Sequence, residues 1–238
     1  TIFYEPIAII DSNENGTKSL EEILVSINKD GKFKNAFEPS WRNLPVFQQR
    51  YSKLVKDYSN ILLEYVSQWN ISTIDNAISE IILCATKAFI LGGADDFFLL
   101  HGVTSSFATR NIVSYFGPNE ENEKIMFLRY YALTLLVAYI CEGCVDLEQN
   151  ITEKTIPWEN ISSQIISDES CNNDAHLIKL VAACKLFNKE LNLDTNLFQI
   201  AASLALKKDL KDPWSYRIGS GFSDPARFGE IYGPKPSK

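Results

Sequence analysis

The amino-acid sequence predicts an all-α fold: a single helical domain over residues 1–238. Apolar residues recur at intervals of three and four along most of the chain, and no segment shows the alternation typical of a β-strand. Of the 238 residues, 45% are hydrophobic and 12% aromatic, which is enough for a substantial core and too apolar for a disordered chain. An irregular segment before about residue 45 and a Gly/Pro-rich C-terminal tail should flank the helices.

The helices follow from these apolar stripes and from the residues that start and stop them. Asp95 or Asp96 should begin one helix, and Asn173 or Asp174 should cap another, because a short polar side chain accepts hydrogen bonds from the first N–H groups of a helix. Glycine and proline mark the ends. Helices are expected over residues 19–27, 46–69, 74–91, 96–116, 121–142, 158–167, 174–190 and 196–210.

Composition excludes several classes of function. The net charge is −7 and no basic cluster is present, so the sequence argues against a nucleic-acid partner. The most apolar run, residues 130–141, is shorter than the roughly 20 residues that a membrane span needs, and we expect a buried helix there. The five cysteines form no disulfide framework, so a reducing, cytoplasmic setting is expected, with Cys84 and Cys184 as small buried residues. The CxxC spacing at 141–144 has no second pair for zinc.

The residues that stand out chemically are His101, His176 and Lys179, in a chain with only two histidines. His176 and Lys179 share one helical face with Leu180 and Phe187, so Lys179 is expected in apolar surroundings with a lowered pKa. A neutral lysine can act as a base, form a Schiff base, or take up carbon dioxide as a carbamate. Alternatively, His176 is a hydrogen-bonded core residue and Lys179 reaches solvent or pairs with a carboxylate such as Asp174.

Two segments resemble a known family. "FFLLHGVTSSFATRNIVSYF" (97–116) and "DAHLIKLVAACKLFN" (174–188) are similar to the H-x-V-T-x-x-H-A-L-R and D-x-H-V-x-K helices of the questin oxidase-like proteins. "WSYRIGSGF" (214–222) is similar to the W…RG.GF ending of that family. The resemblance covers about residues 45–225 and implies an all-α oxygenase fold.

The resemblance also implies an activity and a metal site. Fungal members oxidise anthraquinones and open a ring, in a Baeyer–Villiger-type or dioxygenase reaction, and NADPH is expected as a further cofactor. Some members look like mononuclear non-haem iron enzymes whose metal is held by histidines and a carboxylated lysine. Carried over to this chain, His101 and His176 match the metal-ligand histidines, and Lys179 matches the lysine that carries the carbamate.

Substrate contacts are expected from residues near these ligands. Aromatic side chains such as Phe97 and Phe107 are expected to line a site for a small apolar or aromatic substrate, with Phe98 and Tyr130 as further candidates, although core packing explains them equally well. Arg110 could bind the carbamate or a substrate oxygen, or be a surface ion-pair partner.

The chain also departs from the family pattern. Phe107 stands where the first motif has its second histidine, and residues 1–45 lack the N-H-x-x-H and F-H-x-L-I segments. Two histidines and a carbamate form at most a facial triad, which suffices for iron(II). The chain, which begins without methionine, is therefore expected to be the C-terminal part of a longer architecture whose missing N-terminal segment or second chain completes the site. The alternatives are a complete protein with a reduced site, and a degenerate, non-catalytic helical binding or assembly subunit.

Overall fold

The fold is described by a computed structural model that covers residues 16–33, 47–94, 96–172, 174–191 and 195–207. Its regular structure is helical, which confirms the predicted all-α class; a single isolated bridge joins Lys18 to Trp69. The helices of the described residues are α1 (Leu20–Lys29), α3 (Phe47–Ser67), α4 (Ile74–Leu91), α5 (Phe97–Val113), α6 (Glu121–Cys141), α7 (Trp158–Ser167), α8 (Glu169–Asn172), α9 (Ala175–Glu190) and α10 (Leu197–Lys207).

Polar side chains cap several of these helices, and the caps of α5 and α9 are the two that the sequence predicts. Ser19 forms a capping box with Glu22 at α1, and Thr73 accepts from the backbone N–H of the third residue of α4. Asp96 and Asp174 cap α5 and α9 in the same way. The structure differs from prediction in several places. Helix α1 ends at Lys29 instead of 27, α3 ends at Ser67 instead of 69 and is kinked at Tyr58, and α5 ends at Val113 instead of 116. Helix α8 was not predicted.

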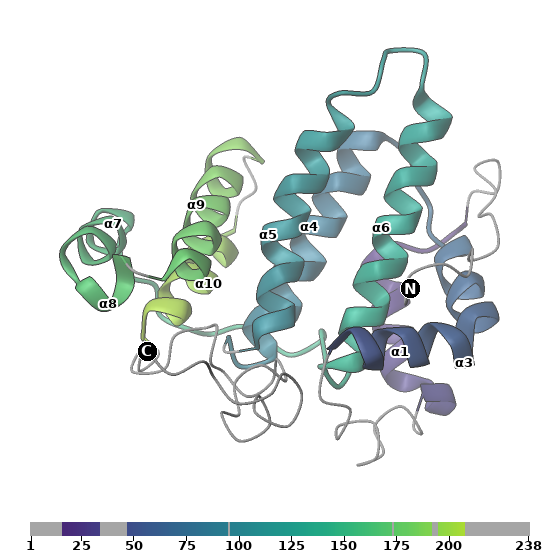
Figure 1. The fold of residues 1–238 in the computed structure, drawn as a ribbon, viewed down its shortest axis with the longest axis horizontal. Coiled ribbons are helices and arrows are strands. Elements are labelled where there is room, and N and C mark those ends of the chain that lie inside the picture. Colours follow the sequence, from purple (N-terminus) through teal and green to yellow (C-terminus); the bar gives the residue numbers. More distant parts are fainter. Residues whose placement is uncertain (1–15, 34–46, 95, 173, 192–194, 208–238) are drawn as a thin grey trace, which may run out of the picture.

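The helices form a layered bundle (Figure 1). Helices α4, α5 and α6 lie side by side in the middle, with α1 and α3 on one flank and α9 and α10 on the other. Helices α7 and α8 lie outermost, beyond α9 and α10. Helix α4 packs against α1, α5, α6 and α10, and ten of its 18 residues are buried.

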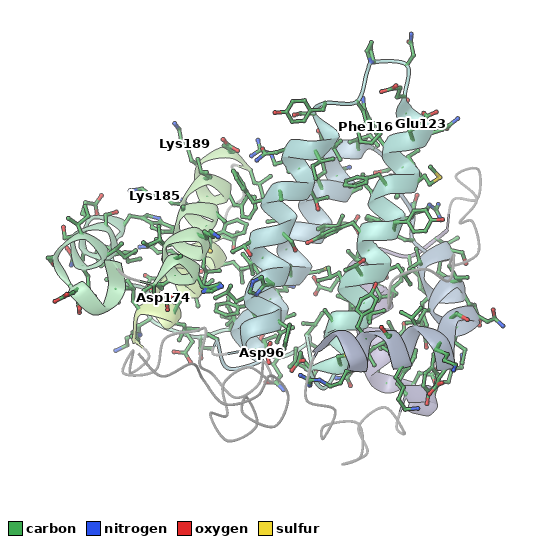
Figure 2. The ribbon with its side chains drawn as sticks, viewed as in Figure 1. Asp96, Phe116, Glu123, Asp174, Lys185 and Lys189 are labelled. Carbon is green, nitrogen blue, oxygen red and sulfur yellow. The ribbon has the colours of Figure 1, made fainter. Side chains whose placement is uncertain are left out.

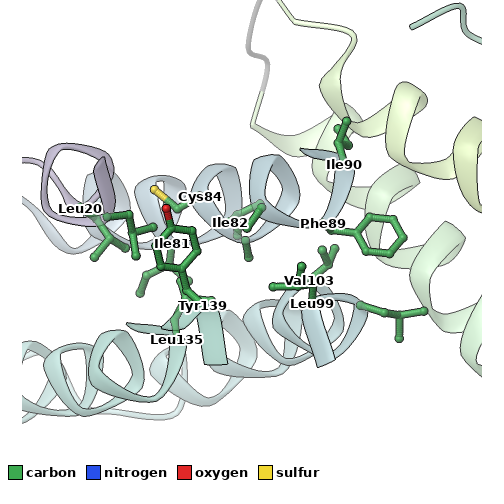
Figure 3. Close-up of a cluster of buried hydrophobic side chains, with 14 of the residues drawn as sticks. Leu20, Ile81, Ile82, Cys84, Phe89, Ile90, Leu99, Val103, Leu135 and Tyr139 are labelled. Atoms are coloured by element: carbon green, nitrogen blue, oxygen red, sulfur yellow. The ribbon is translucent and has the colours of Figure 1, made fainter. Parts of the chain in front are cut away.

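The core is continuous across these layers. Figure 3 shows Ile81 of α4 near Leu20 of α1 and Tyr139 of α6, and Phe89 of α4 above Leu99 and Val103 of α5. Cys84 and Cys184 are 1% and 0% exposed, which confirms the prediction that they are small buried residues. The fold therefore has one hydrophobic core that connects the two flanks.

Helix α6 contains the apolar run that the sequence predicts to be buried. Among the described residues it is the one helix with the length and mean hydropathy (1.5 over an 18-residue window) of a membrane span. Half of that window is buried inside the protein, where α6 packs on α3, α4 and α5. Core helices of soluble proteins meet the same criterion, so length and hydropathy are weak support for a span.

Two buried arginines, Arg50 of α3 and Arg129 of α6, were not predicted. Arg50 of α3 forms an ion pair with Glu142 at 3.3 Å, and both side chains are about nine-tenths buried. The Arg50 guanidinium also lies 5.6 Å from the centre of the Phe98 ring. Arg129 of α6 is fully buried. Nothing in the apolar pattern of α3 or α6 distinguishes these arginines from solvent-exposed ones.

Candidate functional site

Helices α5 and α9 run in the same direction and begin at the same end of the molecule. Figure 2 shows their capping residues, Asp96 and Asp174, at the lower ends of the two helices. Contacts between the helices follow one another in the same order on both: the His101 and His176 rings are closest to the caps, and the Phe107 and Phe187 rings come next. An ion pair between Arg110 and Glu190 closes the far end.

The structure brings together the only two histidines of the chain. The ring centroids of His101 and His176 are 5.4 Å apart and the rings are inclined by 61°. The two residues are 75 positions apart in the sequence and lie on different helices. The His176 side chain is 28% exposed, so the pair lies at the edge of the core, within reach of solvent.

The spacing of the two rings suits shared metal ligation. A metal about 2.1 Å from one nitrogen of each imidazole would lie roughly 3.2 Å from each ring centroid. For ligand angles of about 90–120°, the centroids would then be roughly 4.5–5.5 Å apart. The observed 5.4 Å falls within this range. Within the described residues, no third His, Cys, Asp or Glu side chain joins the two histidines in a group with metal-site geometry.

Asp174 is a buried carboxylate beside His176. One of its oxygens, Oδ1, accepts hydrogen bonds from the backbone N–H groups of His176 (2.9 Å) and Leu177 (3.4 Å). The same oxygen lies 3.6 Å from Nδ1 of the His176 ring, and the Asp174 side chain is only 4% exposed. Asp174 thus joins two roles: it caps α9 and it places a negative charge next to one nitrogen of the imidazole.

The surroundings of His176 favour its neutral form. Burial lowers the pKa of His176, and the positive charges that His101 and Lys179 can carry lower it further. The charge of Asp174 acts in the opposite direction but does not reverse the shift. A neutral imidazole is the form that binds metals or accepts a proton. His176 is therefore suited to both tasks near neutral pH.

Lys179 requires a correction. The sequence predicts a buried, neutral lysine, but the structure places Lys179 at an exposed position of α9. The apolar face of α9 is narrower than assumed: Leu180 and Phe187 are buried in the core, whereas Lys179 lies on the outer rim of the helix. The argument from burial to a neutral amine is therefore wrong. The predicted closeness of Lys179 and His176 is retained. Lys179 lies one turn after His176, and its charge lowers the pKa of the His176 ring.

A cluster of hydroxyl groups supports the backbone around His101, and sequence reasoning missed it. Ser105 donates to the carbonyl oxygen of His101, and its Oγ lies 2.7 Å from the hydroxyl of Tyr131 on α6. Tyr131 in turn donates to the carbonyl of Gly102 at 3.1 Å. Burial raises the pKa of Tyr131 to about 12, so the phenol stays protonated and can donate. These bonds tie the His101 turn of α5 to α6.

Two of the predicted substrate residues, Phe107 and Arg110, lie further along α5 than His101 and contact other residues of α9. The ring of Phe107 lies 6.0 Å from that of Phe187, which is 5.7 Å from Phe198 of α10. Arg110 is paired with Glu190, as expected of a surface ion-pair partner. The side chain of Phe97 lies outside the described part of the structure. Contact of these residues with a substrate stays a prediction.

Comparison with known families identifies the family of this chain. Residues 6–184 match the model of the family described as questin oxidase-like. The chain belongs to the questin oxidase-like family. Both histidines and Lys179 lie within the match, which begins earlier than the expected residue 45 and ends before the segment 214–222. No curated protein and no solved structure matches the chain. Membership of the questin oxidase-like family suggests an oxidoreductase of the oxygenase type.

Proposed function

We propose that this chain is a non-haem metal-dependent oxygenase that inserts oxygen into, or cleaves, an aromatic or quinone-type ring. His101 and His176 would hold the metal, and Lys179 would supply an oxygen ligand as its carbamate. The observation that carries the proposal is that the only two histidines of the chain lie 5.4 Å apart, on helices whose motifs resemble the metal-binding motifs of the family.

The roles of the residues follow from their environment. The lowered pKa of His176 keeps a ring nitrogen available as a ligand at neutral pH. Asp174, close to Nδ1, favours the tautomer with a proton on that nitrogen and leaves Nε2 as the ligating atom. The exposed position of Lys179 gives carbon dioxide, which bicarbonate supplies, access to its amine. The carbamate would form from the neutral fraction of this amine with release of one proton. A bound iron(II) would activate dioxygen. For a Baeyer–Villiger-type insertion NADPH is proposed as the source of two electrons, whereas in ring cleavage by a dioxygenase the substrate itself would supply the electrons.

Metal content tests the proposal directly. The protein would be prepared with an affinity tag that contains no histidine, loaded anaerobically with iron(II) in the presence of bicarbonate, desalted and analysed for metal. We expect about one iron per chain in the wild type. His101→Ala and His176→Ala should each abolish stoichiometric binding, because no other histidine can replace them. Lys56→Gln, at an exposed position of α3, is the matched control for lysine substitutions.

The carbamate has its own test. Lys179→Gln should reduce iron binding, omission of bicarbonate should reduce it in the wild type only, and ¹³C-labelled bicarbonate should give a carbamate NMR signal that the variant lacks. Absence of stoichiometric iron, manganese and zinc, with no effect of His176→Ala, would exclude the oxygenase for this chain. Oxygen uptake with hydroxyanthraquinones would then establish the substrate class for a protein that does bind metal.

The second candidate function is a non-catalytic helical subunit of the same fold. It is favoured by Phe107, which stands where the family motif has a histidine and packs against Phe187. An aromatic ring at this position stabilises the contact between α5 and α9 without any ligand. The two candidates differ in the effect of the His101→Ala substitution, which should leave partner binding by a non-catalytic subunit unchanged.

A further inference from the structure

The outer flank of α9 forms a groove with α7. The first turns of α7 contribute Trp158, Glu159 and Ser162, and α9 contributes Lys185, Leu186 and Lys189. The groove has a volume of about 730 Å³, within the range of small-molecule sites in proteins. Figure 2 shows Lys185 and Lys189 on the side of α9 that faces α7.

Helix α7 packs against the core through three apolar side chains, of which Trp158 and Ile165 are only partly buried. Ile161 is the buried residue of α7, while Ile166 is 76% exposed. Helix α7 packs mainly on α8 and α10. Its first turns therefore stand off from α9, and the apolar surfaces of Trp158 and Leu186 are left lining an open space.

The polar groups of the groove give it a positive charge in an acidic protein. Lys185 and Lys189 are one helical turn apart, so their side chains emerge on the same face. Lys185 donates a hydrogen bond to Oγ of Ser162 at 3.1 Å, which holds its ammonium group across the groove. Glu159 supplies one negative charge against these two positive charges, in a chain whose net charge is −7.

The groove is separate from the histidine pair. His176 and Lys185 are nine positions apart on α9, and an α-helix turns by about 100° per residue, so the two side chains leave on opposite flanks. His176 meets α5 on one flank, and Lys185 meets α7 on the other. A ligand in the groove would not touch either histidine.

The geometry points to a second binding site, for a planar aromatic carboxylate, in the groove between α7 and α9. The indole of Trp158 and the side chain of Leu186 offer apolar surface to the ring system. The ammonium groups of Lys185 and Lys189 bind the carboxylate, in keeping with the positive charge of the groove. A neutral aromatic molecule of the same shape would keep the apolar contact with Trp158 and Leu186 but lose the charge interaction with Lys185 and Lys189.

The test uses 2-naphthoate as the probe, with 2-naphthalenemethanol as its neutral counterpart, in titration calorimetry with the full chain. Naphthoate should bind with 1:1 stoichiometry and about tenfold more tightly than the alcohol. The double substitution Lys185→Gln with Lys189→Gln should remove that difference. Both lysines are exposed, so this variant should fold normally, which an unchanged thermal melting curve would verify.

Two controls separate this site from the one proposed above. Lys56→Gln removes one positive charge far from the groove and should leave naphthoate binding unchanged, and so should His101→Ala. The inference is overturned if naphthoate fails to bind at millimolar concentration, if the alcohol binds equally well, or if the double lysine variant binds like the wild type. It is also overturned if His101→Ala abolishes binding, because the probe would then lie at the histidine pair.

Discussion

Replacing Asp174 separates its two roles, the helix cap and the charge next to His176. Asp174→Ala leaves two N–H groups without their acceptor, one of them at the buried residue Leu177. Loss of a cap of this kind costs about 1–3 kcal/mol in the free energy of unfolding. In a chain of this size that corresponds to a fall in Tm of about 2–12 °C. Asp174→Asn keeps a capping oxygen and should lose less than about 1 kcal/mol at pH 8.

The Asn variant should become weaker as the pH falls. The folded-state pKa of His176 is already lowered, and without the Asp174 charge it falls further. The unfolded chain then takes up the proton first, so stability present above a pH of about 6.5 is lost as the pH drops below it. This loss should be steeper in Asp174→Asn than in the wild type.

Calorimetric melting of metal-free protein between pH 8 and pH 5.5 measures both effects. Asp96 is the matched control, because it caps α5 through N–H groups of Phe98 and Leu99 and is not among the groups that shift the His176 pKa. Asp96→Asn should therefore show no added steepness at low pH. Equal destabilisation by Asp174→Ala and Asp174→Asn at pH 8 would refute the division into cap and charge.

Three further outcomes are expected. His101→Gln should raise the pKa of His176 in the metal-free protein, because a nearby positive charge is removed. NMR titration of the single remaining histidine measures this pKa. An unchanged midpoint would contradict the electrostatic effect of His101 on His176. Phe187→Ala should cost about 3–5 kcal/mol in urea unfolding, since the ring is fully buried against two others, whereas Leu186→Ala, at a 37% exposed side chain, should cost under about 1 kcal/mol. The Cys141 thiol should resist alkylation at pH 8 until the protein is unfolded, because burial raises its pKa to about 12; rapid labelling of the folded protein would contradict that environment.

The helices could be predicted because short polar side chains mark where they begin. Ser19, Thr73, Asp96 and Asp174 each precede an apolar stripe and accept hydrogen bonds from its first N–H groups, and the structure places the caps there. The four-residue helix α8 has too few positions to show a period, so the sequence pattern could not reveal it.

The candidate site could be predicted only in part. The shared face of His176 and Lys179 follows from helical spacing, but the extent of burial around a helix depends on how far its neighbours wrap it. Lys179 lies just beyond that limit and is exposed. The approach of His101 to His176 is a contact between distant segments, which no local period encodes; family resemblance was the only signal for it. The contact between Ser105 and Tyr131 likewise joins two different helices, so no local sequence pattern predicts it.

The parallel arrangement of α5 and α9 has a thermodynamic consequence for any ligand that bridges the two rings. Such a ligand would close a loop of 75 residues, and an unfolded chain seldom brings positions so far apart into contact. It would therefore bind the folded protein almost exclusively. It would cross-link the central helices to the α9–α10 flank. At a ligand concentration 100 times its Kd, folding would gain about 2.7 kcal/mol, which is a rise in Tm of roughly 5–11 °C. The melting temperature is thus a direct gauge of whether the two histidines share a ligand.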